Sequence, residues 1–296
     1  MPVRLTGGAV FPDKGYPMKL SVLISVYDKE SPVFFAQCLE SLAQQTLPAD
    51  EVIIVEDGLL GKELRSTIDA WRSVLPIVSL RMPAHVGLGA ALRAGLYQCQ
   101  GEYVARMDSD DICVPERFER QVSYLDNHRE VDVVGAAIAE FEQDPAAPRA
   151  IRRLPASGEA LWRFARSRTP MNHMTVVFRK PSVVWAGNYE SWQGFEDYHL
   201  WARMLTLGFQ LRNLKEVLVF ARCGNGMQGR RGGLSYLKRE IRFQSFLRRM
   251  GLQDMAGSVW NILIRGSVRL APGSIRALLY RSLLRSRPVP VLRTMH

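Results

Sequence analysis

Short apolar segments recur along the first third of the chain and alternate with segments of helical spacing. Four of them, rich in Val, Ile and Leu, span residues 19–27, 51–57, 77–80 and 101–107. Because apolar residues run through them with few interruptions, we expect strands that are buried on both faces. Strands that alternate with helices build a mostly parallel sheet with helices on both faces. The pattern therefore predicts an α/β fold.

Helix signals lie in the segments between these strands. Ser31 precedes Pro32, as expected for an N-cap residue followed by proline in the first helical position. Further helices are expected over residues 61–74, 87–98 and 115–128. The pattern continues with expected strands at residues 131–141, 174–178 and 217–221, and with expected helices at residues 159–166, 194–207 and 234–250.

The composition excludes several classes of protein. The 296 residues are 47% hydrophobic and 23% charged, which is typical of a globular protein with a large core. The longest apolar runs have the length of a strand, well short of the roughly 20 residues of a membrane span. The four cysteines show no CxxC spacing, so we expect reduced thiols and a cytosolic protein.

Positive charge is concentrated in the C-terminal quarter. From Arg222 to the end there are 15 Lys and Arg residues and two acidic residues, Glu240 and Asp254. This asymmetry indicates an anionic partner, such as phosphate groups, anionic lipid or nucleic acid. The Arg residues alternate with apolar clusters, so the segment either forms basic amphipathic helices at a membrane surface or packs on the body of the protein.

Three carboxylates follow the fourth expected strand. They are Asp108, Asp110 and Asp111, at the end of residues 101–111. If the chain stays extended, Asp108 and Asp110 point the same way and repel unless a cation or a proton lies between them. Oxygen ligands suit Mg²⁺ or Mn²⁺, and the carboxyl ends of strands are where open α/β sheets bind ligands. The alternative is that these residues only cap the next helix.

Five stretches together carry a family resemblance. They are SVLISVY at 21–27, EVIIVEDG at 51–58, VGLGAALRAG at 86–95, GEYVARMDSDD at 101–111 and FEDYHLW at 195–201. In order and approximate spacing, the chain resembles family 2 glycosyltransferases of the GT-A type. It is most similar to the bacterial members that assemble exopolysaccharide or O-antigen units. The resemblance implies a GT-A, Rossmann-like catalytic domain at residues 19–223, preceded by a leader at residues 1–18 and followed by a basic helical extension at residues 224–296.

The resemblance implies a donor site for a nucleotide diphosphate sugar and a divalent metal, Mn²⁺ or Mg²⁺. Asp108, Ser109 and Asp110 match the family's DxD motif. This implies that Asp110 is the metal ligand, and that Asp108 and Ser109 lie nearer the ribose or the donor sugar. Tyr27 and Asp57 stand where the family forms its base and ribose pocket, although Asp57-Gly58 alone also fits a simple turn.

Three arginines are candidates for the donor diphosphate. Arg93 stands where the family often has Asn, and it could pair with a diphosphate or with an acid such as Asp108. Arg230 and Arg231 lie in a glycine-rich loop that would close over the donor. The alternative for Arg93 is a solvated helix arginine, and the alternative for Arg230 and Arg231 is a disordered basic loop.

The resemblance also implies an inverting reaction with one general base. That base is Asp197, with Glu196 beside it, although an acid pair before a helix also fits simple N-terminal capping. His173, Trp192 and Trp201 are candidate acceptor-side residues, because aromatic faces suit sugars. Taken alone, each of these three residues is more often part of the core.

These features predict a metal-dependent, inverting glycosyltransferase that moves a sugar to a saccharide or lipid-linked acceptor in surface polysaccharide biosynthesis. We expect it in the cytoplasm or on the inner face of the cell membrane, without a nucleic-acid partner. One alternative is a sugar-phosphate nucleotidyltransferase, but residues 27–32 do not resemble the Gly-rich nucleotide loop of such enzymes. Another is a non-enzymatic protein that binds an anionic surface through the basic C-terminal segment.

Overall fold

The computed structural model describes residues 20–223 and 234–270. Within these residues one sheet of nine strands has the order β3-β2-β1-β4-β8-β6-β9-β5, with β7 beside β6. The strands are β1 (Leu20–Val26), β2 (Glu51–Glu56), β3 (Ile77–Arg81), β4 (Tyr103–Met107), β5 (Ile112–Cys113), β6 (Val133–Phe141), β7 (Ala150–Arg152), β8 (Val177–Arg179) and β9 (Leu211–Arg222).

The first half of the sheet is parallel, as the sequence predicts. β1 pairs with β2 and β4, and β2 pairs with β3, all in parallel register. Val26 lies opposite Glu56, and Ile24 lies opposite Met107. The carboxyl ends of these strands therefore meet at one edge of the sheet, which is where open α/β sheets bind ligands.

The second half of the sheet is mixed, which the strand patterns did not predict. β8 runs antiparallel to both β4 and β6, while β6 and β9 are parallel. The short strands β5 and β7 pair antiparallel with β9 and β6. These two strands were not predicted, because two or three residues carry no periodicity.

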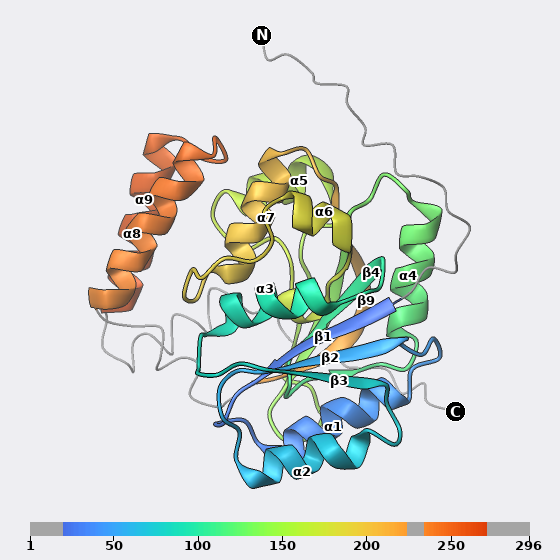
Figure 1. The fold of residues 1–296 in the computed structure, drawn as a ribbon. Helices are drawn as coiled ribbons and strands as arrows, with labels where there is room; N and C mark the ends of the chain where they lie inside the picture. Colours follow the sequence, from blue (N-terminus) through green and yellow to red (C-terminus); the bar gives the residue numbers. More distant parts are fainter. Residues whose placement is uncertain (1–19, 224–233, 271–296) are drawn as a thin grey trace.

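Helices cover both faces of the sheet (Figure 1). α1 (Pro32–Ala43), α2 (Lys62–Trp71) and α4 (Arg117–Asn127) pack on one face with Phe35, Leu64 and Phe118 in their core. On the other face α3 (Leu88–Gln98) and α7 (Glu196–Thr206) enclose a second core, with Leu92 and Trp201, alongside α5 (Gly158–Ala165) and α6 (Lys180–Trp185). Ser31 is the N-cap of α1, with its side chain accepting from the Phe34 amide at 3.4 Å, as predicted.

The described part of the C-terminal segment forms two helices, α8 (Leu234–Arg249) and α9 (Met255–Leu270), which stand beside α7 and α5 in Figure 1. Phe243 of α8 stacks on Phe195 with ring centroids 4.4 Å apart. Its neighbour Phe246 belongs to the same apolar cluster, together with Tyr198 of α7. This pair of helices is therefore packed on the α/β part of the chain.

An ion pair joins α8 to α9. Glu240 is fully buried, and its Oε1 accepts from Arg265 at 2.9 Å and from Gln244 at 2.8 Å. No helix of residues 20–223 and 234–270 is long and apolar enough to cross a membrane.

Candidate active site

The acidic stretch after β4 turns instead of staying extended. β4 ends at Met107, and a turn follows at Ser109 and Asp110. Asp108 forms an ion pair with Arg106, and the Ser109 hydroxyl donates to Glu30 at 2.7 Å. The expectation of two carboxylates in line along a strand is therefore wrong, because the backbone turn gives each acid its own surroundings.

Asp110 carries negative charge that the described residues leave largely uncompensated. Burial raises its pKa to about 7, and the charges of Asp108 and Glu30 add to the effect. A divalent cation would offset this charge, so carboxylate oxygens at this place fit Mg²⁺ or Mn²⁺. Among the described residues, no three His, Cys, Asp or Glu side chains are grouped to hold a metal ion by themselves. A metal held by Asp110 would therefore take its other ligands from substrate phosphates and water, which is common for Mg²⁺.

The raised pKa of Asp110 predicts how stability depends on pH. The folded protein holds the proton up to about pH 7, whereas the unfolded chain releases it near the ordinary value of 3.8, so stability falls between these pH values and stays lower above them. In chelator at pH 8, the free energy of unfolding of Asp110→Asn should exceed that of wild type by about 1 to 3 kcal/mol, a range that allows for solvent screening. Denaturant melts at pH 8 and pH 5 measure this, and the difference should shrink at pH 5. Equal stability at pH 8 would contradict the assignment.

Arg222 holds the acidic turn from the far side. The Asp111 carboxylate accepts from the Arg222 amide at 2.7 Å, and the guanidinium donates to the Asp110 carbonyl at 3.1 Å. The same guanidinium lies over the rings of Phe34 and Phe141, at 3.9 and 4.5 Å from their centroids. The end of β9 is thus fixed against the turn that carries Asp110.

Asp57 fastens the loop before α3. Its two oxygens accept from the amides of Val86 at 2.7 Å and Gly87 at 3.1 Å, and His85 lies 2.9 Å from it. Gly58 follows with a φ of +92°, and a Cβ there would lie 2.9 Å from the His85 nitrogen, so glycine is required at this turn. Asp57-Gly58 thus forms a turn, and the donor-binding role of Asp57 stays a prediction. The ring of Tyr27 lies 5.9 Å from that of His85, at the same edge of the sheet.

The second acidic pair lies in the first turn of α7. Asp197 accepts from the Thr169 hydroxyl at 3.1 Å, and burial raises its pKa above the usual range. Glu196 accepts instead from the Gly194 amide at 2.9 Å. Burial raises the pKa of Glu196 too. Close packing with α3 holds this segment, since a Cβ on Gly89 would lie 2.9 Å from the Glu196 side chain.

The charges of Asp108 and Asp197 act on the same buried group, the Tyr189 phenol. Burial raises the pKa of the Tyr189 phenol, and the charges of both Asp197 and Asp108 raise it further. The Tyr189 hydroxyl lies 3.0 Å from His173 Nε2. Burial, helped by the charge of Arg106, lowers the pKa of His173 well below its usual value, so the imidazole is neutral. The structure therefore brings the predicted donor acid and the predicted base to one place.

Other candidates lie elsewhere. Trp201 is fully buried in the core beneath His173, with ring centroids 6.1 Å apart, so its side chain has no surface to offer an acceptor. Trp192 stacks on His199 at 4.6 Å and packs against α8. Arg93 is exposed and donates to the Tyr189 carbonyl at 3.2 Å. The arginine that pairs with Asp108 is Arg106, not Arg93.

Arg230 and Arg231 lie outside the described residues, so the proposed closure of their loop stays a prediction. Glu30, Arg106 and Arg222 are site residues that the sequence reasoning missed. For Arg106 a signal was present, because a charged residue inside an otherwise buried strand needs a partner. Glu30 and Arg222 gave no signal, since their roles depend on contacts between segments that are far apart in the sequence.

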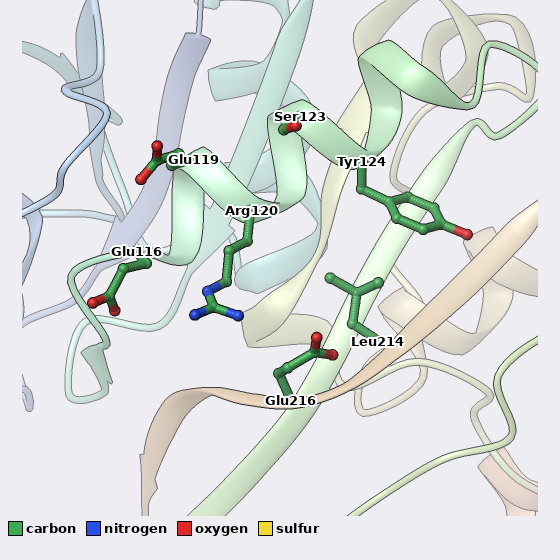
Figure 2. A pocket seen from close by; sticks show the side chains of 7 residues that line it. All are labelled: Glu116, Glu119, Arg120, Ser123, Tyr124, Leu214 and Glu216. Atoms are coloured by element: carbon green, nitrogen blue, oxygen red, sulfur yellow. The ribbon is translucent and has the colours of Figure 1, made fainter. Parts of the chain in front are cut away.

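A separate hollow of about 430 Å³ lies between α4 and β9 (Figure 2). Arg120 of α4 and Glu216 of β9 face it, and so do Glu116, Glu119 and Tyr124. None of the acids of the candidate site lines it, so we do not assign it a part in the chemistry.

Comparison with known proteins agrees with this site. The family model described as Glycosyl transferase family 2 matches residues 21–185. The amylovoran biosynthesis glycosyltransferase AmsE of Erwinia amylovora is 44% identical over 263 residues, covering 88% of this chain and 97% of that protein. A UDP-Gal:alpha-D-GlcNAc-diphosphoundecaprenol beta-1,3-galactosyltransferase of Escherichia coli is 36% identical over 267 residues, covering 90% of this chain and 97% of that protein.

Solved structures share the fold at low sequence identity. TarS 1-349 of S. aureus in complex with UDP-GlcNAc matches with a TM-score of 0.62 and 19% identity, covering 77% of this chain and 66% of that chain. The mannosyltransferase PcManGT of Pyrobaculum calidifontis in complex with GDP-Man and Mn²⁺ matches with a TM-score of 0.60 and 16% identity, covering 93% of this chain and 83% of that chain. The family match over more than half of the sequence, together with these relatives, shows that this chain belongs to glycosyl transferase family 2 and is a glycosyltransferase with a GT-A fold.

Proposed function

We propose that the protein transfers a sugar, with inversion, from a nucleotide diphosphate donor to a lipid-linked saccharide in surface polysaccharide biosynthesis. The observation that carries this is the meeting of Asp108 and Asp197 around Tyr189, at the carboxyl edge of the parallel strands. A donor acid and a base that act on one group suit a direct displacement, in which the acceptor hydroxyl attacks as the diphosphate leaves.

The names of the relatives support the classes of donor and acceptor. TarS and PcManGT were solved with nucleotide diphosphate sugars, and the Escherichia coli relative acts between UDP-Gal and a GlcNAc-diphosphoundecaprenol. AmsE belongs to the biosynthesis of a polysaccharide, amylovoran. We infer the same chemical classes here: a nucleotide sugar as donor, and a saccharide on a lipid diphosphate as acceptor.

The residues of the candidate site have separate roles in this reaction. Asp197 takes the proton of the acceptor hydroxyl, and its buried position brings its pKa closer to the operating pH, where a base is effective. Thr169 orients that carboxylate by its hydrogen bond of 3.1 Å. Asp57 and Tyr27 form the edge that receives the base and ribose of the donor. A divalent cation at Asp110, Mn²⁺ or Mg²⁺, would supply Lewis-acid neutralisation of the leaving diphosphate.

A product assay tests the proposal and separates it from the rival enzyme class. The purified protein is incubated with a panel of nucleotide sugars and GlcNAc-diphosphoprenol, and the released nucleotide is measured. We expect a nucleoside diphosphate together with an extended lipid product. A parallel reaction contains a nucleoside triphosphate and a sugar phosphate, and pyrophosphate formed there, without lipid extension in the first reaction, would instead identify a sugar-phosphate nucleotidyltransferase.

The surface of α9 supports contact with the inner face of the cell membrane. Five apolar side chains one helical turn apart are exposed along this helix: Met255, Val259, Trp260, Leu263 and Ile264. On α8, the helix paired with α9, Arg248 and Arg249 add positive charge. An apolar stripe beside basic residues is typical of helices that lie in a membrane interface with anionic lipid. A lipid-linked acceptor would be met at the same surface.

Trp260→Ser combined with Leu263→Ser should weaken binding to vesicles of phosphatidylcholine and phosphatidylglycerol by about tenfold or more, because two large apolar side chains no longer enter the interface. Cosedimentation measures the bound fraction. Trp185→Ser is the matched control, since Trp185 is also exposed (70%) but lies on α6. Unchanged binding of the double variant, or an equal loss in the control, would rule out α9 as the contact.

A further inference from the structure

Arg106 is a buried charge whose hydrogen bonds are incomplete. It is the fourth residue of β4 and is 2% exposed. One terminal nitrogen pairs with Asp108, while Nε and the other terminal nitrogen have no partner among the described residues. Buried donors are nearly always paired, and leaving one unpaired destabilises the fold. The two free nitrogens therefore need an explanation.

Two other buried arginines in the same sheet region show what a structural arginine looks like here. Arg179 of β8 donates from all three nitrogens, to the Val131 carbonyl at 3.0 Å, the Tyr103 hydroxyl at 3.0 Å and the Leu125 carbonyl at 2.7 Å. Arg117 also uses all three of its nitrogens. Both are thus satisfied within the protein, whereas Arg106 is not.

The surroundings of Arg106 are those of the reaction centre. Alternation along β4 places its side chain on the same face as Val104, toward α3 and α7. Its charge acts on Asp108, on His173 and on Asp197, which come from three different segments. Burial lowers the pKa of Arg106, but the charge and hydrogen bond of Asp108, together with Tyr189 and Asp111, keep it above its ordinary value, so the guanidinium is charged. A fixed cation thus acts on both the donor acid and the base.

We propose that Arg106 is a sugar-binding residue: one nitrogen holds Asp108 in place, and the two free nitrogens donate to oxygen atoms of the transferred sugar. This inference rests on the proposed function, because it assigns a partner within the same site. The neutral imidazole of His173 lies 3.0 Å from the Tyr189 hydroxyl, so these two groups bond to each other and neither is a partner of the two Arg106 nitrogens.

The test compares the affinity for a nucleotide sugar with that for the matching nucleoside diphosphate. Arg106→Lys keeps the charge but loses the planar set of donors. We expect about tenfold or more weaker binding of the nucleotide sugar and unchanged binding of the nucleoside diphosphate, measured by calorimetry on the full chain with Mn²⁺. A merely structural arginine would change both affinities alike. Arg179→Lys is the matched control and should change neither.

The outcomes distinguish a failure of this inference from a failure of the proposed function. If Arg106→Lys binds both ligands like wild type, or loses both equally, the inference is wrong and the proposed function stands. If wild type binds neither ligand, both fail. Should Arg106→Lys not fold, the double variant Arg106→Met with Asp108→Asn removes both charges of the pair together. It should bind the nucleotide sugar about tenfold more weakly than Asp108→Asn alone, and equal binding would overturn the inference.

Discussion

Asp197→Asn should lower kcat by about 10²- to 10⁴-fold, with little change in thermal stability or in donor affinity. The amide has the shape of the carboxyl group and can keep a hydrogen bond with Thr169, but it cannot take a proton from the acceptor hydroxyl. The pH profile gives a second measurement. Because a base works only when ionised, wild-type kcat should fall as the pH drops through the raised pKa of Asp197, and this limb should be missing in the variant.

Glu196→Gln is the matched control for this prediction. Glu196 is adjacent in sequence and also has a raised pKa, but its carboxylate accepts from the amide of its own loop, at Gly194. We expect less than about a tenfold loss of kcat from this variant, because no proton transfer is assigned to it. A large loss in Glu196→Gln with nearly full activity in Asp197→Asn would show that the base is the other acid.

Asp110→Asn should abolish most metal-supported turnover, with a loss on the order of 10²–10³-fold at every concentration of Mn²⁺ or Mg²⁺. The reason is electrostatic. Burial and the charges of Asp108 and Glu30 disfavour the ionised form of Asp110, and a cation beside the leaving diphosphate would offset this negative charge. Initial rates over a metal titration measure the effect, and chelation should inactivate wild type reversibly.

Asp69→Asn provides the control for loss of an acidic side chain. Asp69 is exposed on α2 and pairs only with Arg72 at the surface, so its removal should leave the metal titration unchanged. Full activity of wild type in chelator, or an Asp110→Asn variant that responds to metal like wild type, would contradict the assignment of the metal to Asp110.

The half of the fold that holds the donor site could be predicted from sequence, because its signals are local. Buried parallel strands have continuous apolar sequences, which makes them recognisable. Each of β1, β2 and β4 ends just before a polar residue of the site. Ser31 and Pro32 marked the start of α1 for the same reason. Asp57 and Asp108 follow β2 and β4, the two parallel neighbours of β1, so both lie at the same edge of the sheet.

The remainder depends on contacts between distant segments. The antiparallel placement of β8 between β4 and β6 is a property of the assembled sheet. A strand of three residues is too short for its sequence to predict its direction or its neighbours. Trp201 and Trp192 were candidates for an acceptor surface because the sequence alone does not distinguish an aromatic residue in the core from one in a binding groove. Likewise, the direction of Asp110 depends on a turn that Glu30 and Arg222 hold from outside the motif.

A thermal-shift panel of nucleotide sugars tests the central claim most directly, namely that Asp110 and its neighbours form a metal-dependent donor site. Wild type and Asp110→Asn are melted with each UDP- and GDP-sugar in Mn²⁺, Mg²⁺ or chelator. A ligand that binds only the folded state raises the melting temperature by mass action. The account predicts a rise for wild type with at least one nucleotide sugar, present in metal, absent in chelator and lost in Asp110→Asn. A wild type that no nucleotide sugar stabilises, or an equal rise in chelator and in Asp110→Asn, would contradict it.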